Sequence, residues 1–181
     1  INQIVIDFEN IDSLDASLKV DVIYIAIGQK LSLSELVYIK KNNRKSFVNV
    51  DYNYIKKVAE FAKNCGASSI GLISAIGANT KSFNTYLKVK GDVEQEIKLV
   101  GYKKIIIAHP SHLLGKRAGE DIPMNVKVFE QITNLIGLLM IGPLQKFRNV
   151  EAKKVAKAII SKMDSVEEGI HYIDYKYFKN F

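Results

Sequence analysis

Short apolar runs alternate with longer amphipathic segments along this chain. The apolar runs are rich in Ile and Val and are bounded by turn residues, which is typical of buried strands. They predict strands at residues 3–8, 20–27, 69–74, 103–108 and 169–175. The amphipathic segments carry apolar residues at helical spacing and predict helices at residues 52–64, 86–100, 126–141 and 150–163. Strands separated by helices predict an α/β fold, in which helices cover both faces of a parallel sheet.

Candidate ligand-binding residues directly follow the predicted strands. In a doubly wound parallel sheet, ligands bind beyond the carboxyl ends of the strands. Asp7, Gly28 and Ser74 lie at such ends, and so does the loop 109–112, which reads His-Pro-Ser-His. We therefore expect a binding site where these segments meet.

The composition is that of one globular domain. The chain has 181 residues, of which 48% are hydrophobic and 25% charged, which suffices for a real core. We expect a single domain over residues 1–181, with a small substrate-side portion from about residue 113. The one cysteine, Cys65, excludes a disulfide framework and favours the reducing cytoplasm. The longest apolar segment, 132–141, is interrupted by polar residues, so no membrane span is expected. No His/Cys cluster has metal-ligand spacing.

The net charge of +7 raises the question of a nucleic-acid partner. Most lysines alternate with acids, as along residues 88–98, and this alternation predicts a solvated helix face. One polar stretch, which we expect to be a loop, concentrates positive charge: Lys40, Lys41, Arg44 and Lys45. That loop can hold a phosphate or an acidic substrate, or it can be an ordinary basic surface. We expect no nucleic-acid partner.

Tyr86 and Lys90 form the candidate catalytic pair. They lie one turn apart at the start of a predicted helix, so they share a face. A phenol has a reference pKa of about 10, and an ammonium stabilises its phenolate. Moving that pKa to about 7 requires roughly 4 kcal/mol. Ser74, at a strand end, can hydrogen-bond the same substrate oxygen.

The spacing Tyr-x-x-x-Lys is not specific by itself. It also occurs at Tyr52, Tyr172 and Tyr175. Context singles out Tyr86 and Lys90, because a strand ending in Ser74 and a Gly-Ala-Asn loop precede the pair. The alternative interpretation is an exposed helix start without chemistry.

Several stretches together resemble a known family. They are Asn49-Val-Asp-Tyr, Ala62-Lys-Asn-Cys-Gly-Ala, Ile73-Ser-Ala-Ile-Gly-Ala, Tyr86-Leu-Lys-Val-Lys-Gly-Asp-Val-Glu, His109-Pro-Ser-His-Leu-Leu-Gly, Val150-Glu-Ala-Lys-Lys-Val-Ala and Gly169-Ile-His-Tyr-Ile-Asp. In combination they resemble the atypical short-chain dehydrogenase/reductases. The subgroup they are most similar to is the Tat-interacting-protein-like NAD(P)-binding proteins, often labelled nucleoside-diphosphate-sugar epimerase-like. The resemblance implies a Rossmann-like fold and covers nearly the whole chain.

The resemblance also implies roles for individual residues. Tyr86 would be the general acid/base, Lys90 would hold the nicotinamide ribose and lower the tyrosine pKa, and Ser74 would orient the substrate carbonyl. The residues implied to contact an NAD or NADP cofactor are Asp7, Phe8, Ala26, Ile27, Gly28, Lys90, Pro110, Ser111, His112 and Leu113. NADP is slightly preferred. Position 109, usually arginine in these relatives, is histidine here.

One family feature does not occur in this sequence. The family begins with a strand, a Gly-x-x-Gly-x-x-Gly turn that seats the pyrophosphate, and a second strand. This chain starts at Ile1 and contains no such glycine turn. In the strand order 3-2-1-4-5-6, two strands would lie between residues 3–8 and 20–27, and without them the sheet has unpaired edges. We hypothesise a longer native protein, which an intact mass near 20.3 kDa would contradict.

Two classes of function follow. The first is an NAD(P)-dependent, epimerase-like oxidoreductase that acts on a carbonyl or hydroxyl of a small molecule or nucleotide sugar, with Tyr86 moving the proton. The alternative is a non-catalytic dinucleotide-binding protein that senses redox state or supports a partner interface. The fold alone does not choose between them. The substrate and the oligomeric state stay open.

Overall fold

A sheet of four parallel strands runs through the centre of the computed structural model, which describes residues 3–14, 17–115 and 140–181. The order across the sheet is β1 (Val22–Ile25), β2 (Ser69–Ile73), β3 (Lys104–Ala108) and β6 (Gly169–Ile173). Because β2 and β3 lie inside the sheet and are covered on both faces, nearly all of their residues are buried. Four of the five strands expected from the apolar runs are thus confirmed.

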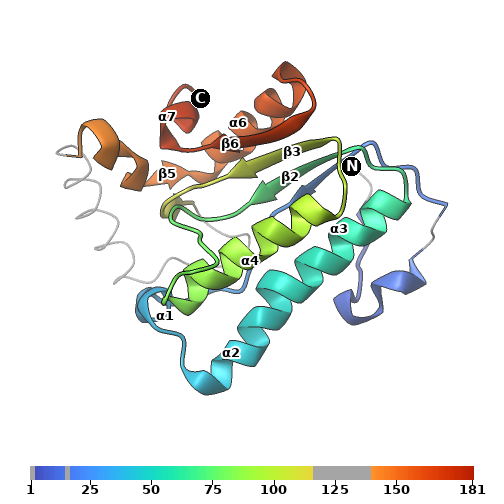
Figure 1. Ribbon diagram of the computed structural model, residues 1–181, viewed down its shortest axis with the longest axis horizontal. Helices are drawn as coiled ribbons and strands as arrows, with labels where there is room; N and C mark the ends of the chain where they lie inside the picture. The colour runs from blue at the N-terminus through green and yellow to red at the C-terminus, as the bar shows by residue number, and fades with distance from the viewer. Residues whose placement is uncertain (1–2, 15–16, 116–139) are drawn as a thin grey trace.

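Helices cover the sheet on both faces (Figure 1). On one side, α3 (Ile55–Asn64) and α4 (Thr85–Leu99) pack on a core that includes Leu72 and Ile107. On the other, α6 (Ala152–Ser165) packs on Ile106. Ile106 and Ile107 therefore face opposite layers, as the two-residue repeat of a strand requires. This arrangement confirms the predicted α/β fold with a doubly covered parallel sheet.

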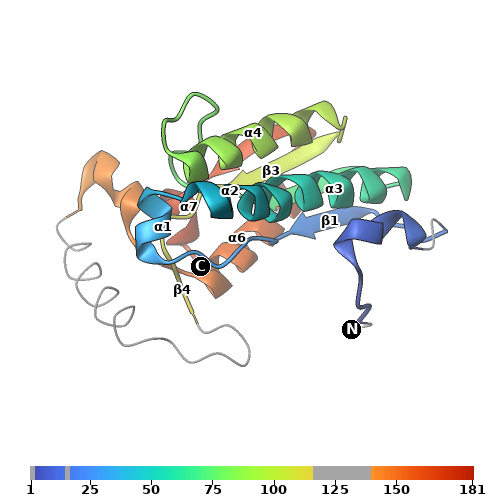
Figure 2. The same cartoon turned by 90° about the horizontal axis from the view of Figure 1, so that it is seen from below.

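The predicted strand at residues 3–8 is wrong. Residues 3–7 have no regular structure, and a 3₁₀ helix, η1 (Phe8–Ser13), follows. Val5 is 96% exposed. The reason is that a strand needs a neighbouring strand to pair its backbone groups. In the expected strand order, two other strands separate residues 3–8 from β1, and in the part of the chain described β1 pairs with β2 alone. η1 packs against α3 instead (Figure 2).

The connection after Gly28 is helical, where a basic loop was expected. It contains α1 (Leu33–Val37) and α2 (Lys41–Val48), so most of the basic residues stand on a helix. α2 runs without a break through a π-helical segment, η2 (Asn49–Tyr54), into α3. The helix that the sequence predicts from residue 52 therefore begins at Lys41. One of the basic side chains, Arg44, donates from Nε to the carbonyl of Ile39 at 3.0 Å.

The region after β3 is less regular. The helix predicted at residues 126–141 lies almost wholly outside the described residues. β4 (Leu113–Leu114) pairs in parallel with β5 (Val150–Glu151). A 3₁₀ helix, η3 (Gly142–Phe147), precedes β5, and a short helix, α7 (Tyr175–Phe178), follows β6. The small sheet brings the segment that follows β3 next to the start of α6.

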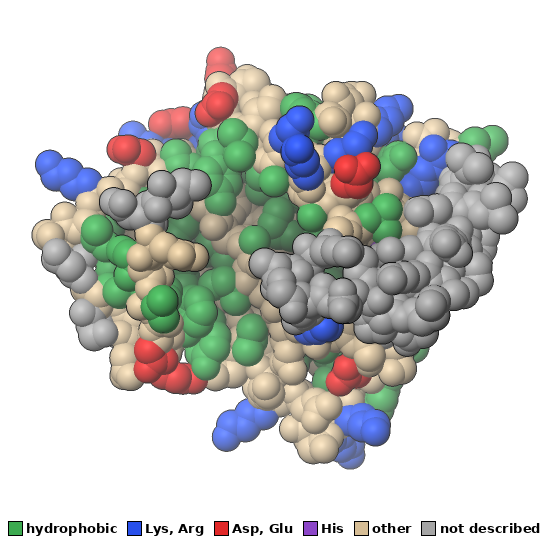
Figure 3. Space-filling model, turned by 180° about the vertical axis from the view of Figure 1, so that it is seen from behind, with side chains coloured by type: hydrophobic (Ala, Val, Ile, Leu, Met, Phe, Trp, Pro, Cys, Tyr) green, Lys and Arg blue, Asp and Glu red, His purple; other side chains and the backbone are tan. Residues whose placement is uncertain are grey.

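Hydrophobic side chains gather in a hollow on the face opposite to that of Figure 1 (Figure 3). Val22 and Tyr24 of β1 are 37% and 43% exposed. Tyr24 lies over Gly71, because a Cβ added there would come within 2.7 Å of the Tyr24 ring and 3.1 Å of Ile159 of α6. The α6 side of the β1 edge is thus apolar and partly open in the described structure.

Candidate functional site

The start of α4 is fixed by one side chain. The Asn84 side chain caps the helix by accepting from the amide of Leu87 at 3.0 Å. Its Nδ2 donates to the carbonyls of Leu36 at 2.8 Å and Val37 at 3.0 Å, at the end of α1. Asn84 therefore sets the position of α4 relative to the segment that follows Gly28.

Successive turns of α4 place Tyr86, Lys90 and Glu94 on one face. Lys90 and Glu94 are each only 5% exposed. The sequence pattern predicted a solvated face for both residues, and that prediction is wrong for them. The alternation of charges along the chain hides the fact that positions four apart share one inward-facing stripe.

Lys90 is held by a buried carboxylate. Its Nζ lies 2.8 Å from Oδ1 of Asp51, whose side chain is 2% exposed. Oδ2 of Asp51 accepts from the backbone amide of Gln29 at 2.8 Å. A Cβ added to Gly28 would lie 3.3 Å from Asp51 Oδ1 and 4.0 Å from Lys90 Nζ. The backbone that follows β1 therefore passes directly beside the end of Lys90.

Tyr86 is partly buried at the opening turn of α4. Its ring lies 6.0 Å from that of Phe47 on α2, measured between centroids. Burial and, to a smaller extent, the negative charge of Asp51 raise the pKa of Tyr86 to about 12. The structure therefore contradicts the expected lowering of this pKa. The ammonium of Lys90 is paired with Asp51, and its charge is largely compensated there.

Ser74 belongs to a second buried polar group. Its hydroxyl donates to Oε1 of Glu94, and Nε2 of His109 lies 2.8 Å from the same oxygen. The imidazole also packs on the ring of Tyr172, with 5.3 Å between centroids. Ser74 is 4% exposed. The structure brings Ser74 to the Glu94 turn of α4, one turn beyond Lys90 and two beyond Tyr86.

Two loops at the carboxyl edge of the sheet carry most of the predicted cofactor contacts. Ala26, Ile27 and Gly28 directly follow β1. The other loop follows β3: the Pro110 carbonyl accepts from the amide of Ile76 at 2.9 Å, and the Ser111 hydroxyl donates to the carbonyl of Phe147 at 2.9 Å. The His112 carbonyl accepts from the amide of Val150, and Leu113 enters β4. Both loops thus border the same end of the sheet, as predicted from their place after the strands.

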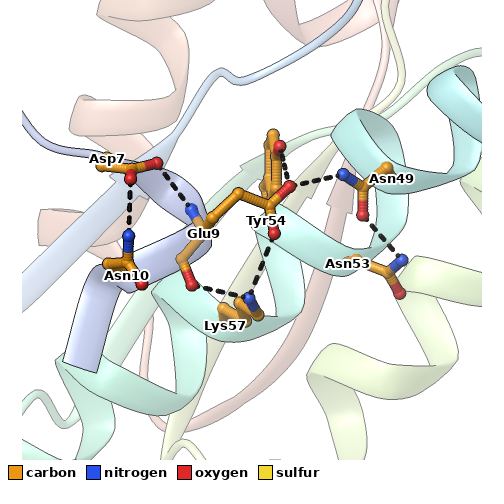
Figure 4. Close-up of polar contacts among 7 residues, drawn as sticks. All are labelled: Asp7, Glu9, Asn10, Asn49, Asn53, Tyr54 and Lys57. Carbon is orange, nitrogen blue, oxygen red and sulfur yellow. Dashed lines mark hydrogen bonds and ion pairs between the residues drawn. The ribbon is translucent and has the colours of Figure 1, made fainter.

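Asp7 lies in a different group of contacts (Figure 4), and its neighbour Phe8 joins the same region. The Asp7 carboxylate caps η1, since it accepts from the amide of Glu9 at 3.0 Å and from the Asn10 side chain at 2.8 Å. Phe8 stacks on Tyr54, with ring centroids 5.2 Å apart. Glu9 accepts from Tyr54 and Asn49 and faces Lys57. Phe8 and Glu9 therefore hold η1 against η2 and α3, and Asp7 caps η1. Gly28 and Lys90, in contrast, meet at Asp51.

Sequence reasoning missed Asp51 and Glu94. Glu94 stands four residues after Lys90, so helical spacing alone could have placed it beside the catalytic pair. Asp51 gave no such signal, because the π-helical turn that carries it shifts the register of side chains relative to an ordinary helix.

Comparison with known proteins places the chain near two groups of relatives. Protein HTATIP2 of Rattus norvegicus is 32% identical over 118 residues, which are 65% of this chain and 46% of that protein. Protein FMP52, mitochondrial, of Candida albicans is 30% identical over 137 residues, which are 73% of this chain and 55% of that protein. The chain thus spans about half the length of these relatives. No family model matches.

Solved structures share the fold at low sequence identity. The structure of RMD from Pseudomonas aeruginosa complexed with NADPH aligns with a TM-score of 0.56 and 15% identity, over 85% of this chain and 60% of that one. UDP-glucuronic acid 4-epimerase from Bacillus cereus in complex with NAD aligns with a TM-score of 0.59 and 13% identity, over 93% and 58%. These likenesses confirm a Rossmann-like fold. None of the helices described here is long and apolar enough to cross a membrane.

Proposed function

We propose that this chain, which belongs to the atypical short-chain dehydrogenase/reductases, is part of an NAD(P)-dependent oxidoreductase of the epimerase-like type. Its substrate would be a carbonyl or hydroxyl compound, either a small molecule or a nucleotide sugar. The observation that carries the proposal is the buried Lys90–Asp51 pair beside Gly28, with Tyr86 one turn away on the same face of α4.

The residues at Gly28 suit a nicotinamide dinucleotide. Gly28 leaves open the space beside Lys90 that a side chain would enter. A lysine ammonium has more than one N–H donor, so Lys90 can bind ribose hydroxyls while it keeps its ion pair with Asp51. The RMD and epimerase structures are described as complexes with NADPH and NAD. A bound nicotinamide would supply the hydride, and the choice between NAD and NADP, with NADP slightly preferred, is part of the proposal.

Tyr86 would act as a proton donor. With a pKa near 12, ionising the phenol at pH 7 requires roughly 7 kcal/mol at about 1.4 kcal/mol per pH unit. The protonated phenol suits the direction in which a carbonyl is reduced, because its proton can pass to the developing alkoxide oxygen. In the reverse direction Tyr86 must lose its proton. This requires the Lys90 ammonium to move from Asp51 toward the phenol, where it can stabilise the phenolate.

Calorimetric titration of NADPH and NADH into the protein, after its intact mass has been measured, tests the cofactor site. We expect binding of at least one nucleotide, and Lys90→Met should weaken it about tenfold. Lys88→Met is the matched control: Lys88 stands on the same helix, is exposed and pairs with Asp92 at 3.3 Å. The nucleotide affinity of Lys88→Met should differ from that of the wild type by less than twofold. A full-length protein that binds neither nucleotide would refute the assignment.

Turnover separates catalysis from binding. A panel of ketones, aldehydes and nucleotide sugars, followed by NADPH absorbance, should include at least one substrate. Tyr86→Phe should then keep nucleotide affinity within about threefold while the turnover rate falls at least a hundredfold, as expected when a general acid is lost.

A second candidate function is a dinucleotide-binding sensor without catalysis. It is favoured by two observations: the pKa of Tyr86 is raised, and the Ser74 hydroxyl is engaged by Glu94. In that case nucleotide binding persists, Tyr86→Phe changes no activity, and a partner protein responds to NADPH in pull-down experiments. The cytoplasmic location expected from the sequence is likewise a proposal, to be tested by fractionation, since the FMP52 relatives are named mitochondrial.

A further inference from the structure

The carboxylate of Asp51 is the most deeply buried charge of the described residues, at 2% exposure. It stands in η2, the π-helical segment between α2 and α3. π-Helical turns in α-helices occur frequently at functional sites, because they turn a side chain out of the ordinary helical register. Here the turn presents Asp51 to α4, which packs against η2.

Asp51 joins two parts of the proposed cofactor site. One oxygen lies 2.8 Å from Nζ of Lys90, and the other accepts from the amide of Gln29 at 2.8 Å. The two oxygens are bonded to the same carbon, so the distance between the Lys90 ammonium and the Gln29 amide is fixed by one rigid group. Gly28, the neighbour of Gln29, passes 3.3 Å from the carboxylate, measured from an added Cβ.

Burial of this pair calls for an explanation other than stability. A buried ion pair adds little stability compared with apolar residues of the same volume, while the loss of one partner leaves an uncompensated charge. Lys90 is 5% exposed, and Asp51 is the acceptor that the described contacts give it. The pair therefore holds the Lys90 ammonium at the end of the sheet where ligands bind. This ammonium has more N–H donors than its contact with Asp51 uses.

We propose that Asp51 is a positioning residue that acts on cofactor binding through Lys90: anchored to the Gly28–Gln29 backbone, it holds the Lys90 ammonium in the position that binds the nicotinamide ribose. This inference rests on the proposed function for its ligand. Asp51 itself does not touch substrate or cofactor. The same carboxylate also raises the pKa of Tyr86, so it links all three parts of the site.

A double-mutant cycle on NADPH affinity tests the proposal. Asp51→Asn and Lys90→Met should each weaken NADPH binding about tenfold. The double variant should bind no more weakly than either single variant, because Asp51 acts through Lys90. Independent losses, which multiply to about a hundredfold in the double variant, would overturn the proposal. Asp92→Asn, on the exposed side of α4, is the control and should change affinity by less than twofold.

Hydrogen exchange of the Gln29 amide gives a readout without any ligand. This amide should be protected in the wild type and should lose at least tenfold of its protection in Lys90→Met/Asp51→Ala, which removes the acceptor and leaves no unpaired charge, while the amides of β3 keep theirs. Unchanged protection of Gln29 would contradict the proposal. If the wild type binds neither NADPH nor NADH, the proposed function fails, yet this exchange measurement still decides whether Asp51 holds the loop.

Asp51→Asn leaves Lys90 buried without its anion, and this variant can fail to fold. The comparison of Lys90→Met with Lys90→Met/Asp51→Asn then replaces the cycle. In Lys90→Met the Asp51 carboxylate keeps the Gln29 amide as its partner, and in the double variant this pair carries no charge. The proposal predicts equal NADPH affinity for these two proteins. A further tenfold loss on adding Asp51→Asn would refute it.

Discussion

Replacing Gly91 by alanine has two opposing effects on stability: it favours the helix, but it places a methyl group against the neighbouring loop. Gly91 lies inside α4, and alanine there would favour the helix by about 1 kcal/mol. A Cβ on Gly91 would, however, lie 2.5 Å from the carbonyl carbon of Asn79 and 2.5 Å from the amide nitrogen of Thr80. Both contacts are with backbone, which cannot move aside as a flexible side chain can.

The expected change in the free energy of unfolding is the cost of overpacking less the gain in helix propensity. Overpacking in a well-packed region costs about 1–3 kcal/mol, and occasionally more. Here the loop from Ala75 to Asn84 must shift as a unit, so we take the upper end of that range. After the gain in helix propensity, Gly91→Ala should lower the free energy of unfolding by about 2 kcal/mol. With a urea m-value of about 2 kcal/mol per M, the midpoint falls by about 1 M.

Urea unfolding followed by circular dichroism measures this shift, and Gly101 provides the control. Gly101 follows α4 with φ +85°, and nothing lies within 4 Å of an added Cβ. Alanine and serine at Gly101 should therefore cost the same, about 1–2 kcal/mol, for the left-handed backbone alone. At Gly91, serine should cost more than alanine, because the contact is steric. A midpoint that rises or stays unchanged in Gly91→Ala would refute the reasoning.

Two further predictions concern the buried polar groups. His109→Ala should lower the free energy of unfolding by about 2 kcal/mol, since the buried carboxylate of Glu94 loses a hydrogen-bond partner. The control is His171→Ala, at a partly exposed imidazole whose hydrogen bond to the Glu167 carbonyl faces solvent; it should change the urea midpoint by less than 0.3 M by our estimate of about 0.5 kcal/mol. The raised pKa of Tyr86 makes the unfolded state lose a proton first, so stability should fall between pH 10 and about pH 12. Tyr86→Phe should remove about 2–3 kcal/mol of that fall, and equal alkaline unfolding of the two proteins would contradict it.

The strands that lie inside the sheet were predictable from sequence because each is covered on both faces. β3, with Ile105, Ile106 and Ile107 all buried, is recognisable as a continuous apolar run without knowledge of its neighbours. Residues 3–8 show a similar run, yet they form no strand. An apolar run specifies that a segment can be buried, whereas strand formation depends on a partner that the local sequence does not contain.

The candidate site was predictable only where helical or strand-end geometry fixes it. The Tyr86–Lys90 spacing and the loops after β1 and β3 are local features, and the structure places them at one end of the sheet. The direction of the pKa shift of Tyr86 depends instead on the burial of its ring and, to a smaller extent, on Asp51, which is far away in sequence and is turned inward by a π-helical segment. A local pattern of residues could not show that Lys90 already has a partner.

The inward face of α4 supports a functional interpretation on energetic grounds. Tyr86, Lys90 and Glu94 occupy successive turns. The next position in the same series is Lys98, whose Nζ lies 5.5 Å from the centroid of the Tyr172 ring. Burying polar groups is unfavourable unless each is satisfied, and here Asp51 pairs with Lys90 while Ser74 and His109 hydrogen-bond Glu94, all from other segments. Apolar side chains would fill the same volume without these partners. The polar stripe lies at the end of the sheet where ligands bind, so binding and proton transfer explain it better than stability does.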